Sequence, residues 1–268
     1  MAQIAALVWD AMGWCPMQAA IRYPPKGSQG ELRQRDSAGD GSPVARRSAM
    51  FMRLSWGVVI LSWVIAFLAL PYLPEVIPVH WGLHGEANGF ANRLSGTFGL
   101  PGIMTLIMVL LLVLPRYNSV KFSLTAFQDI YAIIIFATIA MFFCIEVLAL
   151  LIAAGIDLPV VIIMPMLIGV LFIVMGALMP HIGRNTTMGI RLPWTLESEE
   201  VWKKTHEHGG PVFAGAGVLV VLGSLVAGMW AMALMLVIIL GVTVYIVVWS
   251  YRLAKEGTGM EMKQCLQN

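Results

Sequence analysis

The chain has 268 residues, of which 59% are hydrophobic and 12% are charged. The charged share is about half of the roughly 25% that is typical of soluble domains, so the composition excludes an ordinary soluble protein. The formal net charge of +2 comes without a basic patch interleaved with aromatic residues, so nucleic acid is not an expected partner.

The first 52 residues differ from the apolar remainder of the chain. Residues 1–20 have the pattern of a short amphipathic helix, but they lack the basic start of a signal peptide. Residues 24–47 are rich in Gly, Pro, Ser and charged side chains, a composition typical of disordered segments. We therefore expect residues 1–52 to form a disordered tail, with a helix on the membrane surface as the alternative.

Long apolar runs dominate residues 53–251. A helix needs about 20 apolar residues to cross a hydrocarbon core that is roughly 30 Å thick. The run from Val212 to Tyr251 would extend about 60 Å at ~1.5 Å per residue, so it supplies two spans, joined by a turn at residues 228–230. The sequence predicts an all-α polytopic membrane protein with six transmembrane helices: Leu54–Leu73, Thr97–Leu114, Ile130–Ala153, Leu158–Met179, Val212–Met229 and Met232–Ser250.

Basic residues are distributed unequally between the predicted loops. On one side of the membrane, Arg93 is the only Lys or Arg residue in the loops. The loops and tails on the other side contain many Lys and Arg residues. The positive-inside rule therefore places both termini, the insert at residues 180–211 and the tail at residues 252–268 in the cytoplasm. The loop at residues 74–96 then faces the outside or the periplasm, in a multi-pass protein of the plasma or inner membrane.

The predicted outer loop combines prolines and glycines with two histidines. Its alternating pattern up to His80 indicates an extended segment, and the glycines and asparagines that follow favour turns. His80, His84 and Glu86 have the chemistry of metal ligands. Gly82 disfavours the helix that would align them, and Trp81 stands where the His-Glu-x-x-His motif has glutamate. We expect no metal site here; instead, His80 and Trp81 are expected to pack the loop onto the helix ends.

The insert between the fourth and fifth spans is compact and charged. Gly189 and Pro193 interrupt regular structure, so Arg191 is expected in a turn at the membrane surface. It is expected there to contact a lipid phosphate or an acidic partner surface. Thr195 or Ser198 can cap the helix that follows.

This helix is expected to be short. Glutamates occupy its first turn and lysines lie nearer its end, as the helix dipole favours. Gly209 and Gly210, followed by Pro211, are expected to end it. The pattern predicts a helix along the inner headgroup layer, where Trp194 and Trp202 would act as interfacial anchors.

Two features lie within the predicted spans. Glu146 is an acid at membrane depth without a basic residue at the same depth, so we expect it to be protonated or hydrogen-bonded to a neighbouring helix. An acid at membrane depth indicates a functional role, because burying its charge is costly. The alternative is that it only forms a structural hydrogen bond between helices. Small residues on the fifth span predict close packing against the sixth span, with a homodimer as the second choice: Gly215, Gly217, Gly223 and Ala227.

Two segments together resemble a known family. The first is LPEVIPVHW, starting at Leu73 and leading into a Gly/Asn-rich loop; the second is NTTMGIRLPWTLESEEVWKKTHEHGG, residues 185–210. They resemble the SdpI family of bacterial membrane immunity proteins, in which Leu-Pro-x-x-Ile-Pro begins a small domain of unknown function. The second motif corresponds to Asn185, Gly189, Ile190, Arg191, Pro193, Trp194, Thr195, Leu196 and Trp202.

The resemblance covers residues 54–251 and implies a six-helix protein that protects its cell from a secreted antimicrobial peptide of the sporulation-delay type. It also implies a cytoplasmic transcriptional repressor as a partner, to which residues around Arg191 would report. The tail at residues 1–52 has no counterpart in the family. On this reading the outer loop meets the peptide, through Pro78, His80, Trp81, His84, Glu86 and Arg93.

Two other classes of function stay open at this point. One is a transporter or exporter of small amphiphiles, and the other is a membrane metallohydrolase that would use His80, His84 and Glu146. The sequence contains no nucleophile–base pair in a recognisable motif and no phosphate-binding glycine loop. We therefore expect no catalytic residue, no cofactor and no enzymatic activity.

Overall fold

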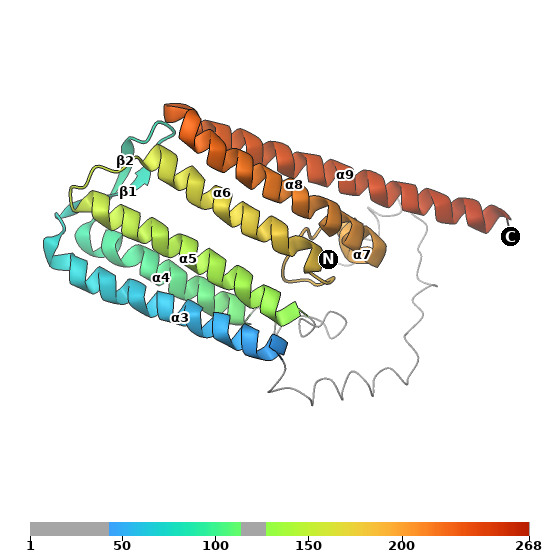
Figure 1. Cartoon of the computed structure of the whole chain (residues 1–268), viewed down its shortest axis with the longest axis horizontal. Helices are drawn as coiled ribbons and strands as arrows, with labels where there is room; N and C mark the ends of the chain where they lie inside the picture. Colours follow the sequence, from blue (N-terminus) through green and yellow to red (C-terminus); the bar gives the residue numbers. More distant parts are fainter. Residues whose placement is uncertain (1–42, 114–126, 268) are drawn as a thin grey trace, which may run out of the picture. The chain divides into compact units, whose positions relative to one another are not determined.

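The computed structural model describes residues 43–113 and 127–267, with side chains up to residue 256. The predictions for residues 1–42 lie outside this part. Within these described residues, six helices are long and apolar enough to cross a membrane, which confirms the predicted all-α polytopic class. They are α3 (Pro43–Ala69), α4 (Arg93–Val113), α5 (Gln128–Ala153), α6 (Val160–Leu178), α8 (Glu199–Val226) and α9 (Ala231–Gln267) (Figure 1).

The helices pack as two groups of three. α3 and α4 pack with α5, whereas α6 packs with α8 and α9, and α5 contacts α6 between the groups (Figure 1). Inside the first group, Val59 of α3 and Met104 of α4 meet Tyr131 of α5 in a buried apolar cluster. The outer surfaces of the spans stay apolar and exposed, which requires a lipid environment: for example Leu68, Leu106, Leu219, Val237 and Leu240.

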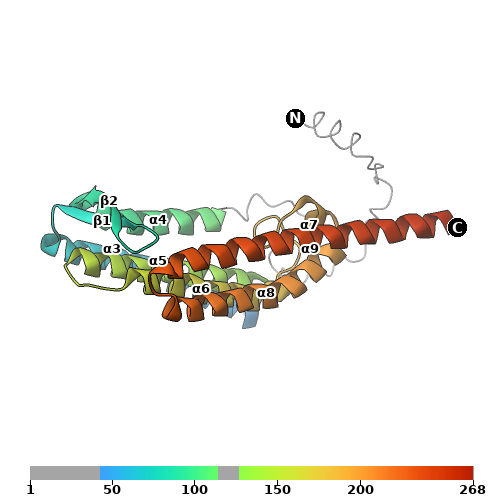
Figure 2. The same cartoon turned by 90° about the horizontal axis from the view of Figure 1, so that it is seen from above.

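A β-hairpin covers one end of the bundle, which we name the hairpin end. Strand β1 (Val76–Trp81) pairs antiparallel with β2 (Ala87–Asn92), which confirms the extended segment and adds a two-stranded sheet to the helices (Figure 2). Ile77 is buried against the ends of α3 and α5. Asn92 then caps α4, because its Oδ1 accepts from the Ser95 amide at 2.9 Å.

Glycines allow α6 and α8 to approach each other at backbone distance. A Cβ on Gly217 of α8 would lie 2.5 Å from the Gly169 carbonyl oxygen of α6, and one on Gly169 would lie 2.8 Å from the Gly217 carbonyl oxygen. Gly223 does face α9, where a Cβ would meet Leu234, but Gly215 has nothing within 4 Å. The prediction that the small residues pack against the sixth span is thus wrong for Gly217, because α6 takes that face.

Helix α8 does not end where the sequence predicts. It runs unbroken from Glu199 to Val226, so the expected short surface helix and the fifth span are one element. Gly210 is buried against the 3₁₀ turn η4 (Met179–His181), where a Cβ would lie 2.8 Å from the Pro180 ring. The glycines therefore serve close packing rather than termination. Similarly, α3 begins at Pro43, so residues 43–52 are helical and continuous with the first span.

Candidate functional site

The two sequence motifs lie at opposite ends of the bundle (Figures 1 and 2). The first forms the hairpin. The second forms the insert loop, residues 182–198, which includes the short helix α7 (Pro193–Glu197) and precedes α8; we name this the insert end. The ends match the predicted division between an outer and a cytoplasmic surface, although sidedness itself stays a prediction from the charge distribution.

At the hairpin end, three of the predicted ligand-binding residues are engaged within the protein. Nδ1 of His80 lies 2.6 Å from the Asn88 Oδ1, across the hairpin. The His84 ring packs edge-on against Trp230, with 5.4 Å between the ring centroids. Arg93 donates from Nη1 to the Leu73 carbonyl at 3.3 Å, which ties the base of the hairpin to the end of α3.

The other three predicted residues have different surroundings. Pro78 is paired opposite Phe90 in the sheet, and Glu86 is exposed beside the hairpin turn. Trp81 lines a cavity together with Asp157 from the loop between α5 and α6. Asp157 was not predicted as a site residue; the available signal was that it is the only charged residue in that loop.

The arrangement of the described residues does not support the hypothesis that His80, His84 and Glu86 or Glu146 bind a metal. No group of three His, Cys, Asp or Glu side chains gathers among the described residues in a way that could hold an ion. His80 and His84 have different partners, and Glu146 is buried within α5. The metallohydrolase alternative therefore lacks the assembled residues on which it depends.

At the insert end, Asn185 organises the start of the insert loop. This side chain is fully buried, and its Oδ1 accepts from the amides of Thr187 and Met188, both at 2.8 Å. Its Nδ2 donates to the Gly183 carbonyl at 2.8 Å. An aspartate could not donate in this way and an alanine would remove all three hydrogen bonds, so the position favours asparagine.

The middle of the insert loop rests on α8 through Gly189 and His206. The Ile190 amide donates to Nε2 of His206 at 3.0 Å, and Nδ1 of the same ring lies 2.9 Å from the Trp202 carbonyl. The ring is therefore a neutral tautomer with its proton on Nδ1. Gly189 has φ of 101°, and a Cβ there would lie 2.5 Å from His206 Nε2, so both conformation and space require glycine.

Thr195 closes the insert loop. Its Oγ1 accepts from the Leu192 amide at 2.9 Å and donates to the Ile190 carbonyl at 2.7 Å, and the residue is fully buried. Of the two predicted caps, Thr195 and Ser198, it is Ser198 that caps α8. Its hydroxyl accepts from the Val201 amide at 3.3 Å. These hydrogen bonds hold the insert loop together, and His206, which was not predicted as a site residue, joins the loop to α8.

The predicted anchoring role is wrong for Trp202. This indole is 2% exposed, stacks on His206 at 4.1 Å between centroids and donates from Nε1 to the Ile182 carbonyl at 2.8 Å. It is buried because α8 continues into the bundle instead of lying along the surface. Trp194 is half-buried and donates to the Ser250 hydroxyl of α9 at 3.1 Å, so it ties the insert loop to the last helix.

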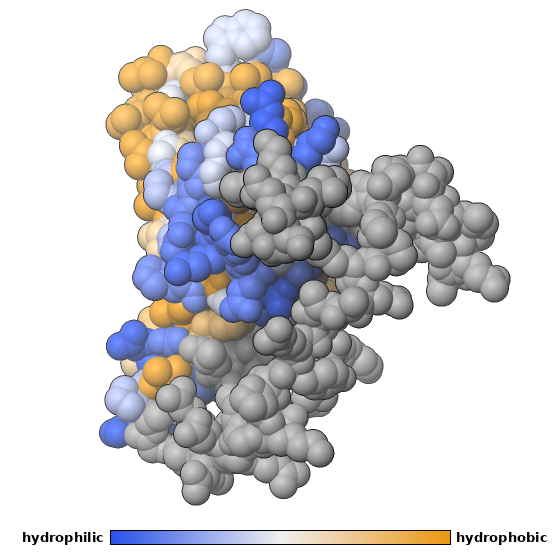
Figure 3. Space-filling model, turned by 90° about the vertical axis from the view of Figure 1, so that its right-hand side faces the viewer, coloured by the Kyte–Doolittle hydropathy of each residue, from blue (hydrophilic) through white to orange (hydrophobic). Residues whose placement is uncertain are grey.

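Charged side chains surround the insert loop. Figure 3 views this end and shows hydrophilic residues gathered at its centre, with hydrophobic residues beside them. Arg191 is exposed and donates from Nη1 to the Thr186 carbonyl. On α8, Glu200 pairs with Lys204 at 2.6 Å and Lys203 pairs with Glu207 at 3.8 Å. Arg191 therefore presents part of its guanidinium on the polar face of this end.

Glu146 lies apart from both ends, between α5 and α3. It is 1% exposed, and neither of its carboxyl oxygens has a hydrogen-bond partner within the described residues. Ser62 of α3 faces it and is also fully buried, but the two groups do not reach hydrogen-bond geometry. The structure thus places the acid at a helix–helix contact, and its functional role stays a prediction.

Sequence models of known protein families match the segments that contain the two motifs. Residues 181–250 match the sequence model of the SdpI/YfhL protein family, and residues 57–105 match a domain of unknown function (DUF1648). The chain is 26% identical over 202 residues to immunity protein SdpI of Bacillus subtilis (strain 168), which covers 75% of this chain and 95% of that protein.

A second relative is shorter. Over 52 residues the chain is 31% identical to the uncharacterized membrane protein YbgB of the same organism. This match covers 19% of the chain and 57% of that protein. No solved structure matches the chain significantly. The predicted resemblance to the SdpI family is thereby confirmed, in a multi-pass membrane protein.

Proposed function

We propose that this protein is a membrane immunity protein that protects its cell from a secreted antimicrobial peptide. The observation that carries the proposal is the similarity to immunity protein SdpI, which extends over 95% of that protein and includes both motifs. The division of the motifs between two ends of one bundle supports a protein that meets its ligand at the hairpin end.

The insert end would report to a cytoplasmic repressor. The motif side chains Asn185 and Thr195 of the insert loop and Trp202 of α8 are buried, so they build the shape of this end rather than touch a partner. Arg191 is exposed, which makes it the motif residue best placed to contact a partner protein. We therefore assign a structural role to the buried motif residues and recognition of the partner protein to Arg191.

Protection and signalling can be measured in one strain. We expect the wild-type chain, expressed in a sensitive strain, to raise survival by at least tenfold when cells are challenged with a sporulation-delay-type peptide. Arg191→Ala should retain this protection but lose induction of a reporter under the cognate repressor. The physical reason is that its exposed guanidinium is remote from the hairpin, where the peptide would bind.

Lys203→Ala is the matched control, because it removes one exposed positive charge from the same end of the bundle. This variant should both protect and induce, and membrane levels of all variants should be equal by immunoblot. Equal survival of cells with and without the wild-type chain would refute the immunity function. Loss of protection in Arg191→Ala would refute the separation of roles.

The sidedness of the two ends has its own test. Single cysteines at Glu86 and Glu200 replace two exposed carboxylates at opposite ends, in a background without the native cysteines. A thiol probe that cannot enter intact cells should label position 86 and spare position 200, because the positive-inside rule places the hairpin outside. The reverse pattern would contradict the proposed direction of signalling.

A further inference from the structure

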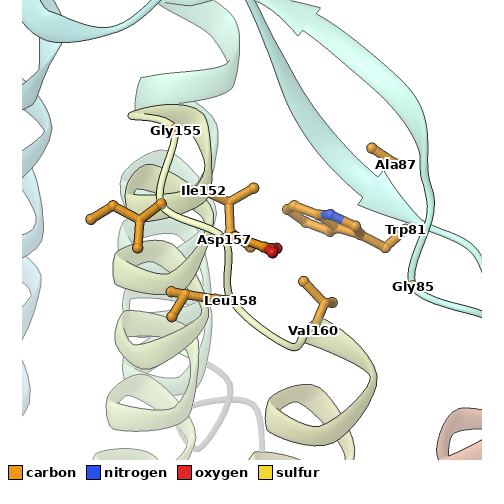
Figure 4. A pocket seen from close by; sticks show the side chains of 9 residues that line it. Trp81, Gly85, Ala87, Ile152, Gly155, Asp157, Leu158 and Val160 are labelled. Atoms are coloured by element: carbon orange, nitrogen blue, oxygen red, sulfur yellow. The ribbon is translucent and has the colours of Figure 1, made fainter. Parts of the chain in front are cut away.

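A cavity at the hairpin end lies between segments that are distant in the sequence. Its volume is about 330 Å³, and its walls come from the hairpin, the end of α5, the loop that follows and the start of α6 (Figure 4). The hairpin residue Gly85 rests on α6, where a Cβ would lie 2.7 Å from Cγ1 of Val161. This contact positions Trp81 over the loop that contains Asp157.

The lining of the cavity joins an aromatic ring to one carboxylate. Figure 4 shows the Asp157 side chain pointing toward the Trp81 indole, with apolar side chains such as Ile152 and Val160 around them. Asp157 is the only ionisable residue among those that line this cavity. An indole face and a carboxylate both attract a cation, and an apolar wall accommodates the methylene groups that carry it.

The charge of the surrounding surface favours the same kind of ligand. In the segments 70–96, 154–159 and 227–230, which form the hairpin end, the acidic residues are Glu75, Glu86 and Asp157. The one basic residue there is Arg93, whose guanidinium donates to the Leu73 carbonyl. This end is therefore negative on balance, which attracts cationic ligands over a distance.

We propose that the cavity between Trp81 and Asp157 binds the ammonium group of a lysine side chain in a cationic peptide. The ammonium group lies against the indole face and pairs with the carboxylate, while the lysine methylene groups contact Ile152 and Val160. This inference rests on the proposed function only for the peptide nature of the ligand. The volume is sufficient for one side chain, at the low end of the roughly 300–1,000 Å³ of ligand pockets.

The probe for this site is the tripeptide acetyl-Lys-Lys-Lys-amide, titrated into the full chain in lipid nanodiscs by calorimetry. The same peptide with acetylated lysine side chains lacks the charge at equal length. We expect Asp157→Asn to weaken binding of the charged probe about tenfold, since it removes the counter-charge without changing size. Trp81→Leu should weaken it about fivefold through loss of the cation–π contact.

Glu75→Gln is the matched control, because Glu75 is an exposed carboxylate at the same end but does not line the cavity. This variant should bind the charged probe within about twofold of wild type, since it alters only the surrounding field. Failure of the wild-type chain to bind, equal binding of the acetylated probe, equal binding by Asp157→Asn, or an equal loss in Glu75→Gln would each overturn the site.

The survival assay separates this inference from the immunity function. Protection by the wild-type chain without any Asp157-dependent binding of trilysine would remove the cavity as the ammonium site and leave immunity in place. Conversely, Asp157-dependent binding in a chain that gives no protection would refute immunity and retain the ammonium site.

Discussion

Replacing Gly217 with valine is expected to disrupt the packing of α6 against α8. The first atom of the new side chain would lie 2.5 Å from the Gly169 carbonyl oxygen and 2.8 Å from the Ile173 amide nitrogen, and backbone atoms cannot rotate away. Overpacking of a well-packed interior costs about 1–3 kcal/mol, and a clash with backbone belongs at the upper end. We therefore expect a loss of about 3 kcal/mol, because the helices must separate.

This loss can be measured as thermal unfolding of the purified protein in detergent, together with the fraction that elutes as a single species. Gly215→Val is the matched control, because Gly215 lies on the same helix and has nothing within 4 Å. It should unfold within about 2 °C of wild type, as surface substitutions usually do. An equal loss in both variants would mean that helix propensity, not the contact with α6, determines the effect.

Replacing Trp202 with alanine is expected to unfold the insert loop. The indole is almost fully buried, stacks on His206 and donates to the Ile182 carbonyl, so its loss leaves a cavity and an unpaired carbonyl. Truncation of a buried tryptophan to alanine costs about 3–5 kcal/mol. Trp202→Phe keeps a ring in the cavity but loses the hydrogen bond, so it should cost about 1–3 kcal/mol.

Hydrogen exchange of the Ile190 amide reports this change directly, because that amide donates to His206. We expect its protection to fall in Trp202→Ala and to persist in Trp194→Ala, whose half-buried ring contacts α9 instead. Similar, small effects of the two substitutions would restore the interpretation of both tryptophans as interfacial anchors.

Much of the fold is predictable from the sequence because a lipid environment constrains it strongly. Apolar length alone identifies all six spans, and the turn between the last two corresponds to η5 at Gly228–Trp230. The prolines and glycines of residues 74–96 also indicate the hairpin. The boundaries of α8 were not predictable, since Gly209, Gly210 and Pro211 have the local pattern of a helix stop, whereas contact with η4 decides their conformation.

The candidate site was only partly predictable. The motif of the insert identifies Asn185, Gly189 and Thr195, but it does not reveal that Asn185 and Thr195 form hydrogen bonds with the loop backbone. His206 already lies one helical turn from Trp202 in the predicted short helix, but its hydrogen bond from the Ile190 amide joins segments 16 residues apart, which no local pattern indicates. Asp157 meets Trp81 through the packing of the hairpin on α6, a contact between distant segments that no local pattern contains.

The unbroken course of α8 has a mechanical consequence. This helix has 28 residues and follows the insert loop directly, and its far end adjoins η5, where Trp230 touches His84 of the hairpin. A helix of that length extends ~42 Å, and Gly209, Gly210 and Pro211 are the positions in it where bending is easiest. A tilt imposed where Trp230 meets the hairpin would therefore reach His206 only if the close packing of Gly210 against η4 keeps this segment from bending.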